Sequence, residues 1–237
     1  MLTKTAALVV HKIPHSDHSA VVRLFTLEHG LLPFLIQGLH GKQNKNAYYQ
    51  PGQFLQVVYL RKNGSGLHRI REAQALHNEP LSMQPETQFW MQQLSSFALE
   101  LLSLCLHEEH PEPDLFHCLE QHFQNLSHGK VPVSWFPLSL CLDMAEALGQ
   151  SLPLQEGARK GGIDTQMGQW GHANSLPAHL ISADECRLLR EAQIKGQLNA
   201  PKMERLALLD KLIHHLSVCF FPGKSLKSIA VIRDLSA

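Results

Sequence analysis

Apolar and β-branched residues recur in five short runs near the start of the chain, and a turn signal ends each run. The alternation of apolar and polar positions within these runs is typical of strands. The runs cover residues 5–13, 19–25, 31–38, 53–62 and 67–76. Gly30, between the second and third runs, supplies the positive φ that a tight hairpin turn needs. Five short strands at this spacing predict a small barrel such as an OB-fold.

The apolar spacing changes from strand-like to helical after residue 78. Helices are predicted over residues 84–107, from 113, over 133–148, for about twelve residues after a capping box at Ser182 and Glu185, and over 201–218 before a short tail. Glycines and prolines make residues 150–180 an irregular insertion. The whole pattern predicts an α+β fold, with an OB-fold barrel over residues 1–78 and an all-α helical domain over residues 79–237.

The composition is typical of a globular protein without a membrane anchor. The 237 residues are 44% hydrophobic and 18% charged, which is enough chain for two small cores. No apolar run approaches the length of a membrane span, and no signal peptide is recognisable at the start, so we expect a cytoplasmic location. The five cysteines are odd in number and widely spaced, which favours reduced, buried thiols.

The formal net charge of zero conceals a strong asymmetry along the chain. Residues 1–78 contain nine Lys and Arg against three Asp and Glu, whereas residues 79–130 contain eight acids against one base. A segment with a net charge of +6 predicts a polyanionic partner for the expected barrel.

Two groups of side chains could form a nucleic-acid surface on this barrel. Arg69 and Arg71 are two apart on a strand and therefore project together, opposite Ile70, with Arg61 and Lys62 across the turn. Residues 39–50 show no apolar periodicity and form a polar loop that offers charges for phosphates and rings for bases. The relevant side chains of this loop are Lys42, Lys45, Tyr48 and Tyr49. The other aromatic residues of the strands are expected to fill the barrel: Phe25, Phe34, Phe54 and Tyr59.

Signatures of catalysis are missing from the sequence. It contains no phosphate-binding glycine loop, no HExxH zinc motif and no nucleophile elbow. Sixteen histidines are present, but they form no complete set of short-spaced ligand pairs for structural zinc. We therefore expect neither an enzyme nor a bound cofactor or metal.

Several short stretches together resemble the RecO family of DNA-repair recombination mediators. They are residues 5–11, 24–32, Gln37-Gly38 with Lys42 and Lys45, 50–52, 70–73, 108–116 and 226–229. The resemblance implies an N-terminal OB-fold, a helical domain, and binding of single- and double-stranded DNA in the nucleoid. It also implies annealing of complementary strands, and loading of RecA onto SSB-coated single strands together with RecR.

The resemblance also assigns residues to these activities. It puts DNA contacts on the basic positions Lys12, Arg23, Lys42, Lys45, Arg61, Arg69 and Arg71. Many family members carry a four-cysteine zinc module at the position of residues 157–186. The cysteine pairs of that module are absent from this sequence. We therefore expect a metal-free remnant that packs around Trp170 and the prolines. The family docks the acidic, apolar-ended tail of SSB on its helical domain, for which Arg159, Arg187 and Arg190 are candidate contacts.

Two other interpretations compete with DNA mediation. In the first of these, the barrel is the docking platform of a protein–protein adaptor, and its basic face is incidental. A hydrolase with an unrecognised site is the third interpretation. Charge reversal of Arg69 and Arg71 separates the first two, because only a DNA-binding protein loses affinity for polynucleotides.

Overall fold

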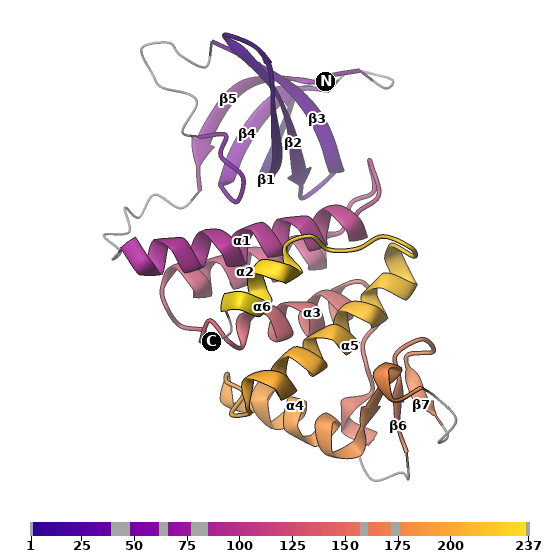
Figure 1. Ribbon diagram of the computed structural model, residues 1–237. Helices are drawn as coiled ribbons and strands as arrows, with labels where there is room; N and C mark the ends of the chain where they lie inside the picture. The colour runs from indigo at the N-terminus through magenta and orange to yellow at the C-terminus, as the bar shows by residue number, and fades with distance from the viewer. Residues whose placement is uncertain are drawn as a thin grey trace. The chain divides into compact units, whose positions relative to one another are not determined.

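A computed structural model (Figure 1) describes residues 2–38, 48–61, 66–76, 85–156, 161–171 and 176–235. The chain divides into two compact units. The first contains Met1–Ser82 and Leu106–Glu120, and the second contains Met83–Cys105 and Gln121–Ala237. The predicted division at residue 78 stays a prediction, and no sequence pattern indicated that residues 106–120 join the first unit.

The first unit is built on a five-stranded antiparallel sheet, which confirms the five predicted strands. The strands are β1 (Leu2–Ser16), β2 (Ser19–Thr26), β3 (Gly30–Gln37), β4 (Phe54–Leu60) and β5 (Arg69–Ala75). Their order in the sheet is β3-β2-β1-β4-β5, so the long strand β1 lies in the centre.

The segment that leads into β5 also pairs with β3. His68 forms a parallel bridge with Phe34, in which the His68 backbone N–H donates to Pro33 and its carbonyl accepts from Leu35, both at 3.0 Å. The two edge strands of the sheet therefore meet, as an OB-fold requires.

One face of the sheet forms an apolar core, and the other packs against the start of helix α2 (Pro113–Ser127). The first face buries Val9, Leu24 and Phe34 completely, and Phe34 meets Tyr59 edge to face at 5.0 Å between ring centroids. Phe25 and Phe54 do not join this core. They contact Phe116 at 5.6 and 5.8 Å between centroids. Successive side chains on a strand point to opposite faces, which explains the difference.

Six α-helices occur among the described residues. They are α1 (Pro85–Cys105), α2 (Pro113–Ser127), α3 (Phe136–Ala147), α4 (Ala183–Lys195), α5 (Lys202–Phe220) and α6 (Ile229–Leu235). In the second unit α3 packs against α1 and α5. Ser182 and Glu185 form the predicted capping box at the start of α4, and Gly149 has a left-handed backbone after α3. None of these helices is long and apolar enough to span a membrane.

The described parts of residues 150–180 contain three short strands, so the helical second unit also includes a small sheet. A small antiparallel sheet has the order β7-β6-β8, with β6 (Gly162–Asp164), β7 (Gln169–Gly171) and β8 (Leu180–Ser182). Three-residue strands are too short to produce an alternating pattern. Gly162 permits their close pairing, because a Cβ there would lie 2.3 Å from the Ile181 carbonyl oxygen.

The short tail predicted after α5 contains a helix, α6, whose entry is capped by α1. The Glu100 carboxylate accepts hydrogen bonds from the backbone N–H groups of Lys227 at 2.9 Å and Ser228 at 2.8 Å. This cap comes from a residue more than a hundred positions earlier, so no local pattern indicated it.

Acidification is expected to release this cap. Burial tends to raise the pKa of Glu100, but hydrogen bonds from Ser228 and Lys227 and the Lys227 charge lower it overall from its usual 4.5. Because the pKa is lower in the folded state, the stabilisation is complete above about pH 4.5 and is lost as the pH falls through the folded-state pKa. The protection of the α6 amides against hydrogen exchange, corrected for the intrinsic pH dependence of exchange, should therefore fall severalfold in acid. A Glu100→Gln variant should lack this pH step, and an identical step in both proteins would refute the cap.

Candidate nucleic-acid interface

A groove of about 540 Å³ opens between β3 and β5 in the first unit. The end of β3 forms one wall, residues 70–74 form the other, and Tyr48 and Tyr49 lie beside them. The groove brings Tyr48 and Arg71 together, two of the side chains selected from the sequence. Arg69 is exposed on the same strand but does not line the groove.

A β-bulge in β5 determines which side chains face this groove. Tyr59 pairs with Ile70 and Val58 pairs with Glu72, so Arg71 is an extra residue without a partner across the ladder. A bulge reorients the side chains around it. Ile70 and Ala73 pack on the core, three residues apart, whereas Arg71 and Glu72 are both exposed. The sequence carried a signal for this bulge, because regular alternation would bury the charged Glu72 and expose Ala73.

The two loop tyrosines have different environments. Tyr48 is 41% exposed, so one side of its ring is accessible to a ligand. Tyr49 is 4% exposed and belongs to the sheet core, and burial raises the pKa of its hydroxyl to about 12. The buried position of Tyr49 does not fit the expectation that its ring is offered to a base. The exposed position of Tyr48 fits the same expectation.

Arg23 is engaged by an acidic residue of its own unit. Its guanidinium forms an ion pair with Glu108, whose side chain is 72% exposed. Glu108 is held beside the sheet by a bridge to Leu31, reinforced by the hydrogen bond from the Glu109 N–H to the Leu31 carbonyl at 3.3 Å. Nucleic acid would therefore compete with Glu108 for Arg23.

The remaining predicted DNA contacts are dispersed. Lys12 lies on β1 opposite Val22, and partial burial lowers its pKa. Arg61 is exposed directly after β4. Lys42, Lys45 and Lys62 lie outside the described residues, as does Arg159.

One of the two candidate tail-binding arginines of α4, Arg187, lies in acidic surroundings. Arg187 pairs with Asp184 and lines a groove with Glu185, Glu191 and Glu204. Arg190 is exposed on the same helix. This groove differs from the apolar pocket flanked by basic residues that an acidic tail requires, so the structure lends these two arginines no support.

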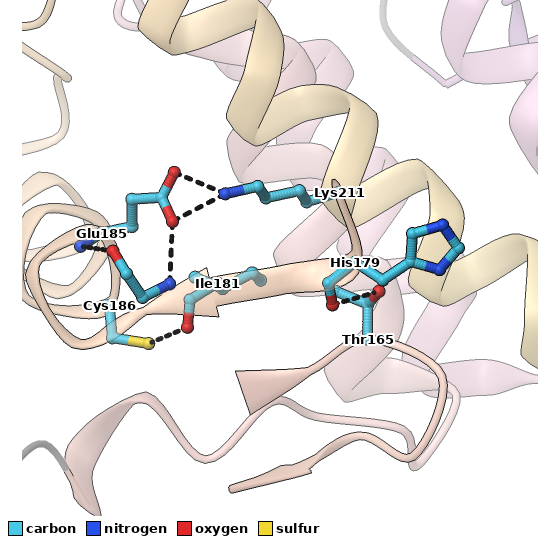
Figure 2. Close-up of polar contacts among 7 residues, drawn as sticks. Thr165, His179, Ile181, Glu185, Cys186 and Lys211 are labelled. Carbon is cyan, nitrogen blue, oxygen red and sulfur yellow. Dashed lines mark hydrogen bonds and ion pairs between the residues drawn. The ribbon is translucent and has the colours of Figure 1, made fainter. Parts of the chain in front are cut away.

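Polar contacts connect the small sheet to the helices around it (Figure 2). The Thr165 hydroxyl donates to the His179 carbonyl at 2.9 Å, and the Cys186 thiol lies 3.7 Å from the Ile181 carbonyl. Trp170 donates to the Pro153 carbonyl at 3.0 Å, in agreement with the expected packing around this tryptophan. Burial raises the pKa of the Cys186 thiol to about 11.

Metal ligands do not converge in the part of the chain that the structure describes. There, no three His, Cys, Asp or Glu side chains are close enough together to hold an ion. The absence of a metal from residues 157–186 nevertheless stays a prediction, since parts of this range lie outside the description.

Comparisons with known proteins agree on one family over most of the chain. A model described as "Recombination protein O N terminal" matches residues 1–78, and one described as "Recombination protein O C terminal" matches residues 94–213. The DNA repair protein RecO of Xanthomonas campestris pv. campestris (strain B100) is 26% identical over 242 residues, covering 96% of this chain and 95% of that protein. The protein of the same name from Flavobacterium johnsoniae is 26% identical over 253 residues, covering 99% of each.

Proposed function

The chain belongs to the RecO family of DNA repair proteins, and from this membership we propose that it is a DNA-binding recombination mediator. It binds single- and double-stranded DNA, anneals complementary single strands, and assists RecA loading on SSB-coated DNA together with RecR. It works by binding, in the cytoplasm at the nucleoid, and carries out no bond-making step.

The observation that carries this proposal is the groove between β3 and β5, with Arg71 on its wall and an exposed Tyr48 beside it. A basic side chain next to an accessible ring is the combination that single-strand binders use for phosphates and bases. The net charge of +6 on residues 1–78 supports the same conclusion, because a surface that neutralises phosphates on two strands lowers their mutual repulsion. Annealing then follows from concentrating the two strands.

Fluorescence anisotropy with labelled single-stranded DNA over a salt series tests the proposal. If about six phosphates are contacted, the logarithm of the binding constant should fall with the logarithm of salt concentration at a slope of about −4. The Arg69→Glu/Arg71→Glu variant should lose at least about tenfold in affinity and have a shallower slope. The matched control reverses two charges in the second unit, Arg187→Glu/Arg190→Glu, and should bind like the wild type.

Either of two results would overturn the proposal. One is the absence of salt-dependent binding to any DNA at low salt. The other is an equal loss in both double variants, which would mean that total charge and not the barrel surface determines binding. The adaptor interpretation would then be tested with SSB-tail peptide and RecR.

Removing the carboxylate that holds Arg23 is expected to strengthen DNA binding. Glu108→Gln should raise affinity about threefold and steepen the salt slope by about 1, because Arg23 becomes available to a phosphate. Glu109→Gln makes the same change of charge at the adjacent residue but leaves the ion pair of Arg23 intact, and it should leave the salt slope unchanged. Equal slopes in both variants would show that Arg23 is not a DNA contact.

A further inference from the structure

We propose that the groove between β3 and β5 holds one unstacked base of the bound strand, and that Glu72 makes it favour bases with an exocyclic amino group over thymine. This inference rests on the proposed DNA binding of the first unit. It assigns a defined occupant to the groove of that surface.

The groove has the size and the lining of a site for a small heteroaromatic ring. Its volume of about 540 Å³ falls within the range of small-molecule sites. Ile36 and Tyr49, each 4% exposed, form an apolar floor, and the accessible ring of Tyr48 offers a stacking surface. Gln37 and Gln74 are exposed on the two walls, and their amides both donate and accept hydrogen bonds. These groups match a flat ring with polar edges.

The charge of the groove argues for a base and against a phosphate as its occupant. Arg71 and Glu72, adjacent at the bulge, both line the wall, so their charges offset each other. A carboxylate repels a phosphate but accepts hydrogen bonds from N–H groups. Adenine, cytosine and guanine each carry an exocyclic amino group, whereas the single ring N–H of thymine lies between two carbonyl oxygens that repel a carboxylate. Glu72 therefore provides the selectivity, and Arg71 remains directed to the flanking phosphate.

Selectivity is tested with short homopolymers of deoxycytidine and thymidine in slightly alkaline buffer, where cytosine is unprotonated. The wild type should bind the cytosine strand about tenfold more tightly, the effect of one hydrogen bond to a charged group. Glu72→Met keeps the length of the side chain but removes the acceptor, so the ratio of affinities should fall to about one. Glu28→Met removes an exposed acid elsewhere in the unit and should leave the ratio unchanged. A ratio near one in the wild type, or an unchanged ratio in Glu72→Met, would overturn the selectivity.

An abasic strand of the same length separates the pocket from DNA binding as such, because it has the phosphates without the bases. The wild type should bind the abasic strand about tenfold more weakly than the cytosine strand. Tyr48→Leu should lose affinity for the cytosine strand only. Equal binding of both strands would refute the pocket and leave the DNA-binding function intact, whereas binding of neither would refute the function itself.

Discussion

Replacing Gly30 by alanine is expected to lower the free energy of unfolding by at least about 3 kcal/mol. Gly30 has φ +69°, a conformation that L-residues adopt only at a cost. A Cβ at this position would lie 2.2 Å from the His110 carbonyl oxygen and 2.5 Å from its carbonyl carbon. Because these are backbone atoms, no side-chain rotation relieves the clash, and the strand or the segment around His110 has to move.

Gly38 provides the matched control for this prediction. Its φ of +75° is nearly the same, but no atom of the residues that the structure describes lies within 4 Å of the position of an added Cβ. Gly38→Ala should therefore cost only the backbone strain, about 1 kcal/mol. Urea unfolding of both variants measures the difference. Equal losses would show that the contact with His110 contributes nothing to stability.

The same substitution has a functional consequence. The segment that presses on Gly30 also places Glu108 beside Arg23. If Gly30→Ala displaces this segment, the folded variant should bind DNA more tightly at low salt, as Glu108→Gln does. The stability and affinity measurements therefore both test the position of the segment around Glu108 and His110.

The turn at Gly30 shows which part of the fold could be predicted from the sequence. Its glycine and the flanking apolar runs are local signals, so the hairpin and the five strands could be recognised directly. The partner of Gly30 is eighty residues away in the chain, and no local pattern connects the two. The cap of α6 by Glu100 escaped prediction for the same reason.

The candidate interface was predictable to a similar extent. The basic character of residues 1–78 and the exposed Tyr48 followed from composition and loop chemistry. The groove itself did not, because it depends on the pairing of His68 with Phe34 of β3, a contact between residues far apart in the sequence. The sequence also could not show that Tyr49 is buried while Tyr48 is exposed, because adjacent residues of one loop can face opposite ways.

The second large effect is expected at Glu185, where one carboxylate has two tasks (Figure 2). It accepts from the Lys211 ammonium at 2.7 and 2.8 Å and from the Ser182 backbone N–H at 2.8 Å, which completes the cap of α4. The side chains of Lys211 and Glu185 are only 14% and 18% exposed. Glu185→Ala would leave a largely buried ammonium without its counter-charge and α4 without half of its capping box. The expected loss of unfolding free energy is about 3–5 kcal/mol.

Two further variants separate the causes of this loss. Glu191→Ala breaks the exposed pair with Lys195 on the same helix, and should cost less than about 1 kcal/mol. Glu185→Ala/Lys211→Met should recover part of the loss, because no charge is left uncompensated. Urea unfolding measures the stability of all three variants. If Glu185→Ala lowers the free energy of unfolding no more than Glu191→Ala does, then water reaches Lys211 and the ion pair does not hold α4 to α5. The small sheet adjoins α4 through β8, so the expected loss would also destabilise the sheet.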